Sequence, residues 1–212
     1  TPEEVAAVDR ALLAAHSEGL IGMSACLKGE INMHLQADQL DKARASAATF
    51  RDILGAENFF LELHDHGLEA QRKCNAELPK IAQEFGLGLV AANDVHFLER
   101  NHHEAHDVMI CIGTGKMVHD EKRMRYTPEL YFKSAAEMRA LFPDHPEAIS
   151  NTVAIAERCN LQLEFGTSKF PEYEPPAGRT REAYLRELCQ QGLRKRYGER
   201  ATTDPELRDE FA

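Results

Sequence analysis

The chain of 212 residues lacks the features of secreted and membrane-spanning proteins. It has five cysteines, an odd number, set far apart and without a CxxC pair. This argues against a disulfide framework or a zinc knuckle and for a reducing compartment. No apolar run approaches the ~20 residues that span a bilayer, and no signal peptide is visible. We therefore expect a soluble, cytoplasmic protein with no membrane partner.

A strong basic patch is also missing. The net charge is −10, and residues 1–96 carry 15 acidic against 8 basic residues. The short basic clusters, 122–125 and 194–196, are interspersed with acids and are typical of solvated helix faces. An acidic amino-terminal part suits a cation site better than a phosphate-binding groove. Because the chain opens on Thr1, we expect it to be an excerpt of a longer protein.

Strand and helix patterns alternate along the first hundred residues. Apolar residues at steps of three and four predict helices, and short apolar runs predict strands. The expected strands are 20–25, 58–64 and 87–93, and the expected helices are 3–18, 37–54 and 69–85. Strand–helix–strand repetition predicts an α/β fold with parallel strands. Pro79, inside the third helix, predicts a kink or a restart there.

After residue 97 the strand signals fade and helices dominate. Ser134 and Glu137 have the spacing of a capping box and predict a helix that runs to Leu141. Further helices are expected over 146–159 and 180–197. The proline-rich segment 170–178 between them is typical of an inter-domain connector. We expect four cysteines on or near apolar helix stripes to be buried, namely Cys74, Cys111, Cys159 and Cys189.

Residues that bind metals follow each predicted strand. In parallel sheets, sites assemble at the carboxyl ends of the strands, and those ends carry Cys26, then His64, Asp65 and His66, then Asp94 and His96. Asp94 and His96 point to one side in extended geometry. A metal site at this edge is therefore the leading hypothesis. The alternatives are a buried thiol at Cys26 and a structural Asp–His hydrogen bond.

Two other motifs favour ordinary structural roles. No strand presents His102, His103 or His106 to the sheet edge, so we expect these histidines to face solvent or cap a helix. The segment 113–116, GTGK, lacks the Walker spacing and a preceding strand. It predicts a turn with a surface lysine.

Several longer segments carry a family resemblance. They are SACLKGEI (24–31), ELHDHG (62–67), NDVHFL (93–98), HDVMICIGTGK (106–116) and YFKSAAEM (131–138). Together, and in collinear order over nearly the whole chain, they resemble the alpha subunits of bacterial DNA polymerase III. The resemblance falls on the polymerase-and-histidinol-phosphatase (PHP) domain and the segment that leads to the polymerase palm. It implies a partial (β/α)7 PHP-type barrel over residues 1–97, followed by a mainly helical segment over 98–212.

The resemblance also implies site residues. Cys26 in SACLKG, and Asp94 and His96 in NDVH, match metal-ligand positions of the PHP domain. It implies zinc or manganese at this site and metal-assisted phosphodiester hydrolysis, used by some members for 3′–5′ exonuclease proofreading. No ligand position carries over to His64, Asp65 or His66, which we expect to support the ligands or to cap the loop.

Some motifs of the family have no counterpart here. The early HxH motif, the later His and Glu ligands and the catalytic aspartates of the palm are absent, so we expect this chain alone to be inactive. The parent would be a DNA-directed DNA polymerase with magnesium at its palm. Its partners would be primer-template DNA, deoxynucleoside triphosphates, a sliding clamp and a proofreading subunit. A free-standing PHP phosphoesterase and a catalytically silent, structural PHP domain are the alternatives.

Overall fold

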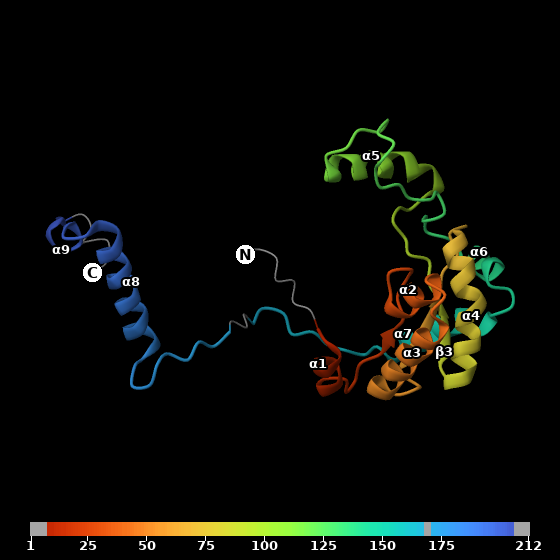
Figure 1. Cartoon of the computed structure of the whole chain (residues 1–212), viewed down its shortest axis with the longest axis horizontal. Coiled ribbons are helices and arrows are strands. Elements are labelled where there is room, and N and C mark those ends of the chain that lie inside the picture. Colours follow the sequence, from red (N-terminus) through yellow and green to blue (C-terminus); the bar gives the residue numbers. More distant parts are fainter. Residues whose placement is uncertain (1–7, 168–170, 206–212) are drawn as a thin grey trace. The chain divides into compact units, whose positions relative to one another are not determined.

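The computed structural model describes residues 8–167 and 171–205 (Figure 1). The chain divides into two compact units, one up to Asn160 and one from Leu161. We describe each unit by itself. The expected division into residues 1–97 and 98–212 separates barrel from connecting segment, and it stays a prediction.

A small parallel sheet forms the centre of the first unit. Its strands are β1 (Gly22–Met23), β2 (Phe59–Leu63) and β3 (Gly88–Ala91), in the order β1-β2-β3. Both pairings are parallel, with Gly22 opposite Phe59 and Leu61 opposite Leu89. The α/β class and the parallel strands predicted from the sequence are confirmed. The partial (β/α)7 barrel stays a prediction, because the described residues contribute three paired strands to this sheet.

The helices of the crossovers cover one face of this sheet (Figure 1). They are α2 (Glu30–Gln36), α3 (Leu40–Leu54) and α4 (Glu69–Phe85). The apolar pattern of the sequence did not predict α2. Alternate residues of β2 and β3 face these helices and form the core with buried side chains of α3 and α4, among them Leu61, Leu63, Leu89, Leu78 and Ile81.

Helix α4 runs through Pro79 as one element. A proline inside a helix removes one backbone hydrogen bond and usually favours a break. Here Leu78 and Ile81, on either side of Pro79, are both buried in the core. Their packing against the sheet holds the helix together, so the expected restart does not occur.

The other face of the sheet carries Phe60, Glu62 and His64 from β2 and its carboxyl end, since side chains alternate along a strand. Gly88 of β3 lies opposite Phe60 on this face. A Cβ atom at residue 88 would lie 2.6 Å from the Phe60 ring. Close packing between β2 and β3 therefore requires glycine at this position.

The remaining helices of the first unit are α1 (Arg10–Ala15), η1 (Arg100–His102), α5 (His103–Thr114), α6 (Ala135–Leu141) and α7 (Pro146–Arg158). Helix α7 packs against β3. Its Asn151 Nδ2 donates to the Leu89 carbonyl at 2.8 Å. The Leu89 carbonyl lies on the edge of β3 that faces away from β2, so α7 supplies a hydrogen-bond donor to this edge.

Gly115 ends α5 in the left-handed conformation and Lys116 is exposed, as predicted for the segment GTGK.

The second unit contains α8 (Arg181–Tyr197) and α9 (Arg200–Thr203). Thr180 caps α8 by accepting from the Ala183 amide at 3.2 Å. No described side chain of α8 is buried. Cys189 on α8 is exposed, as is Cys159 at the end of α7, so the prediction that both are core residues was wrong. Among the described helices, none is long and apolar enough to cross a membrane.

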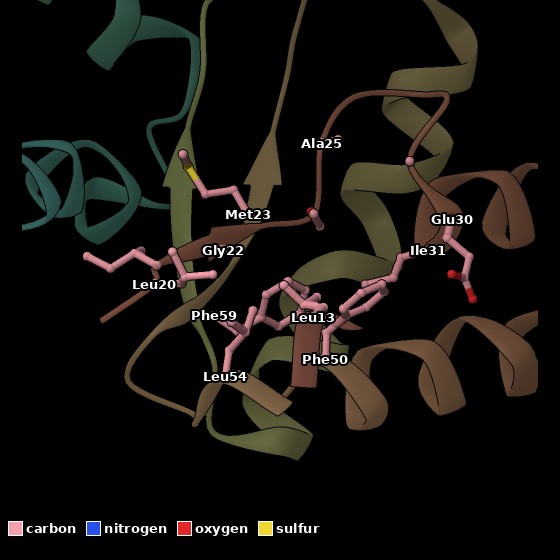
Figure 2. Close-up of a pocket in the computed structure, with 13 residues that line it drawn as sticks. Leu13, Leu20, Gly22, Met23, Ala25, Glu30, Ile31, Phe50, Leu54 and Phe59 are labelled. Atoms are coloured by element: carbon pink, nitrogen blue, oxygen red, sulfur yellow. The ribbon is translucent and has the colours of Figure 1, made fainter. Parts of the chain in front are cut away.

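A cavity of about 310 Å³ lies along β1 in the first unit (Figure 2). Apolar side chains of α1, α3 and β2 line it, among them Leu13, Phe50, Leu54 and Phe59, which point toward one another in the figure. Sheet order places β1 at one end of the sheet, with β2 on its only paired side among the described strands. The cavity is therefore lined in part by a strand that is paired on one side only among the described strands.

Candidate metal centre

The predicted ligand-type residues lie beyond the carboxyl ends of the three parallel strands. Cys26 follows β1, His64 and His66 follow β2, and Asp94 and His96 follow β3. Parallel strands bring these ends to one edge of the sheet. The local geometry of each loop decides which atoms are available there.

Hydrogen bonds to its backbone carbonyls hold the Cys26 loop in place. Asn32 Nδ2 donates to the Ala25 carbonyl at 3.3 Å and to the Cys26 carbonyl at 3.2 Å, and the Gly29 amide donates to the Cys26 carbonyl at 2.7 Å. A Cβ atom at residue 29 would lie 2.2 Å from the Ser24 carbonyl oxygen. The loop therefore turns too tightly for any residue but glycine there, and the half-buried Cys26 has a fixed backbone.

The Asp94–His96 segment leaves one imidazole nitrogen available. His96 Nδ1 lies 2.8 Å from the backbone carbonyl of Asp94, so Nδ1 carries the hydrogen and the lone pair is on Nε2. Metal-bound histidines commonly donate their second ring nitrogen in this way. The Asp94 carboxylate is 41% exposed and its Oδ1 lies 3.8 Å from His96 Nδ1. That distance is too long for the structural Asp–His hydrogen bond considered above.

A buried polar network lies between these two loops. Gln71 Nε2, on α4, is 2.8 Å from His66 Nδ1 and 3.9 Å from Cys26 Sγ. His66 Nε2 is 2.8 Å from the Asn93 carbonyl, next to Asp94. Burial lowers the pKa of His66 more than the Asn93 hydrogen bond raises it. His66 therefore stays neutral and links the Cys26 loop, through Gln71, to the Asp94 loop.

His64 and Asp65 have different surroundings. His64 is 6% exposed, and neither ring nitrogen has a hydrogen-bond partner among the described residues; the carboxylate of Glu62 lies 3.7 Å from Nε2. Asp65 Oδ1 accepts from the Gly67 amide at 2.9 Å. Asp65 thus caps the loop, whereas His64 is a buried imidazole without a hydrogen-bond partner among the described residues.

The described residues do not enclose an ion. No group of three His, Cys, Asp or Glu side chains in the described part of the chain comes close enough to hold one metal. The His96 ring instead packs beside Tyr126 and His106, with ring centroids 4.8 and 5.6 Å away. The described residues therefore do not gather Cys26, Asp94 and His96 around one point, and their role as metal ligands stays a prediction.

Sequence reasoning missed three residues near this edge, namely Gln71, Asn93 and Lys133. Lys133 is 7% exposed, its ammonium donates to the Asn93 side-chain oxygen at 3.4 Å, and burial lowers its pKa. His106, expected to face solvent, is instead partly buried against His96 and Phe97. Lys133 follows Tyr131 and Phe132 in YFKS, and a lysine beside aromatic residues is a sequence signal for a buried cation. Gln71 gave no such signal, because its position resembles that of any polar residue on a helix.

Comparison with known proteins shows which family and which proteins this chain is similar to. The PHP domain family matches residues 2–66, which include Cys26 and His66. DNA polymerase III subunit alpha of Treponema pallidum (strain Nichols) is 40% identical over 192 residues, that of Thermus aquaticus 39% over 202, and that of Mycobacterium tuberculosis (strain H37Rv) 35% over 194. These alignments cover 90%, 92% and 90% of this chain and 16% of each relative. The chain thus spans about a sixth of the length of these relatives, and along most of its own length it is similar to DNA polymerase III alpha subunits.

Proposed function

We propose that this chain is the carboxyl-terminal part of a PHP domain in a DNA-directed DNA polymerase, with its connection to the palm. The observation that supports this proposal is the alignment with DNA polymerase III alpha subunits along 90% of the chain. In the whole protein, deoxynucleoside triphosphates and primer-template DNA are the substrates, and magnesium acts at the palm. A sliding clamp and a proofreading subunit are the protein partners, in the bacterial cytoplasm.

Within that protein the PHP part is a metal centre with zinc or manganese. Cys26 supplies a thiolate, Asp94 a carboxylate and His96 the Nε2 lone pair, a donor set that suits zinc, with manganese at a neighbouring position of the same centre. The sheet of three strands is one part of a (β/α)7 barrel, whose other strands contribute the remaining ligands. The buried ring of His64, which has no hydrogen-bond partner among the described residues, supports this proposal.

The chemistry of the centre is hydrolysis of a 3′ phosphodiester. When bound, the ions supply an acidic water and neutralise phosphate charge. The residues of this chain orient the ligands: the Asp94 carbonyl fixes the His96 tautomer, and Asn32 fixes the backbone of Cys26. Lys133 donates to the Asn93 side chain from a buried position, and so helps to fix the loop that carries Asp94.

The test is metal content by elemental analysis of the full-length protein. We expect two or three bound ions per molecule in the wild type, falling in Cys26→Ser and Asp94→Ala. Cys159→Ser, which changes an exposed cysteine, is the matched control and should keep its metal. A wild type without metal, or a loss equal in all three variants, would contradict the metal centre.

Activity assays separate the alternatives. A polymerase extends a primer, and an active PHP centre also shortens mismatched 3′ ends in a manner lost in Asp94→Ala. A free-standing phosphoesterase would hydrolyse small phosphate esters without primer extension. A structural PHP domain would bind metal and lose thermal stability on chelation, but would leave 3′ ends intact.

A further inference from the structure

Gln71 and His66 are the two most buried polar side chains between the Cys26 and Asp94 loops, at 2% and 3% exposed. Burial of a polar group is costly unless its hydrogen bonds are satisfied. Both side chains direct their hydrogen bonds to each other and to these two loops. Their placement therefore fixes the distance between the loops.

The hydrogen bonds of the two residues have only one consistent direction. A carbonyl oxygen can only accept, so His66 Nε2 donates to the Asn93 carbonyl at 2.8 Å. In a neutral imidazole the other nitrogen then accepts, and His66 Nδ1 receives an N–H of Gln71 at 2.8 Å. Gln71 Oε1 accepts from the His66 amide at 2.8 Å, which fixes the orientation of the Gln71 amide group.

The second N–H of Gln71 remains, and Cys26 Sγ lies 3.9 Å from its nitrogen. Sulfur is a weak hydrogen-bond acceptor, and an N–H held at this distance orients the Cys26 side chain. The thiolate is the form that binds metal. The network thus runs from Cys26 Sγ through Gln71 and His66 to the backbone of Asn93.

We propose that Gln71 and His66 are positioning residues that set Cys26 and Asp94 as ligands of one metal centre. This inference rests on the metal centre proposed above. Gln71 orients the Cys26 thiolate through its N–H, and His66 holds the carbonyl before Asp94. Residues that orient metal ligands from behind typically change metal affinity 10–100-fold when they are replaced.

The test uses Co²⁺ as a probe on the metal-free full-length protein. Cobalt bound by a thiolate gives a sulfur-to-metal charge-transfer absorption, which reports the Cys26–metal bond apart from any activity. We expect Gln71→Leu to weaken Co²⁺ binding about 10–100-fold and to reduce this absorption. Asn75→Ala is the matched control, because Asn75 on the same helix makes one hydrogen bond, to the His64 carbonyl at 2.9 Å, and does not touch the network. Its affinity and absorption should match those of the wild type.

Gln71→Glu is a second variant, used in case Gln71→Leu does not fold. The glutamate keeps the shape and the acceptor for the His66 amide, but it places an oxygen where the N–H faced Cys26 and His66. We expect it to lose affinity and absorption with an unchanged circular dichroism spectrum.

The outcomes distinguish the two proposals. One outcome is that the wild type shows the thiolate absorption and that Gln71→Glu keeps the same affinity and absorption. This result would overturn the positioning role and leave the metal centre intact. An equal loss in Asn75→Ala would also overturn it, since a general weakening of α4 would then explain the effect. A wild type that binds Co²⁺ without thiolate absorption would overturn the role of Cys26 in the metal centre, and this inference with it.

Discussion

At the scale of single residues, the candidate ligand loops hold unusual backbone conformations. Asp94 has φ 49° and Ala25, next to Cys26, has φ 62°. Aspartate tolerates the left-handed region, but alanine there costs about 1–2 kcal/mol. Strained residues of this kind persist where the surroundings hold them, often at functional sites. At Ala25 the surroundings are the carbonyl hydrogen bonds from Asn32.

Replacement of Ala25 by glycine should relieve this strain. Ala25 is exposed, so Ala25→Gly loses little packing, and we expect the free energy of unfolding to rise by about 1 kcal/mol. Urea denaturation measures the change. Ala105→Gly, at an exposed position inside α5, should instead lower stability by about 1 kcal/mol. Equal destabilisation by both substitutions would disprove the strain at Ala25.

At the scale of elements, α6 shows how a local capping motif fixes the start of a helix to the segment that precedes it. Ser134 Oγ accepts from the Glu137 amide, and the Glu137 carboxylate accepts from the Ser134 amide at 2.8 Å. Glu137 also accepts from the Tyr131 hydroxyl at 2.6 Å. The hydrogen bonds from Tyr131 and Ser134 lower the pKa of Glu137 from 4.5 to about 2. The predicted capping box is confirmed, and Tyr131 is a contact that the sequence did not indicate.

Glu137 should make stability depend on pH in the acid range. A carboxyl group whose pKa is lower in the folded state stabilises the fold above its unfolded value, here about 4.5, and loses this contribution as the pH falls toward 2. We expect Glu137→Gln to melt at a lower temperature than the wild type at pH 7, and the difference to shrink between pH 4.5 and 2. Thermal unfolding at a series of pH values measures it. A difference that is constant over this range would contradict the role of the charge.

At the scale of the whole chain, each unit exposes large apolar side chains. In the first unit Met23 on β1 is 48% exposed and Ile112 on α5 is 74% exposed; in the second, Phe165 is 88% exposed. Strand β1, which among the described strands pairs with β2 alone, also lines the apolar cavity (Figure 2). Exposed apolar surface and an unpaired strand edge favour association.

We therefore expect the 212-residue chain alone to self-associate at micromolar concentration. Size-exclusion chromatography with light scattering measures its mass. Met23→Lys puts a charge on the edge strand and should reduce association, whereas Met33→Lys, at an equally exposed methionine on α2, should not. A monomeric wild type with one sharp, cooperative melt would contradict this expectation.

The sequence by itself determined the local elements and the relationship. The period of apolar residues in 69–85 corresponds to α4 (Glu69–Phe85), and Ser134 with Glu137 marked the start of α6, because both depend on interactions within a few residues. The collinear segments likewise sufficed for the resemblance to DNA polymerase III alpha subunits. Cys26, Asp94 and His96 could be selected as candidates because a strand end needs only local pattern to be recognised.

Only the tertiary structure decided how these parts meet. Gln71 is 45 residues from Cys26 in the chain and contacts it, and Lys133 is 40 residues from Asn93; no local pattern encodes such contacts. The continuity of α4 through Pro79 and the packing of His106 against His96 likewise follow from burial against distant residues. Side-chain chemistry and short-range periodicity are properties of the sequence, whereas burial and hydrogen bonds between loops exist only once the chain has folded.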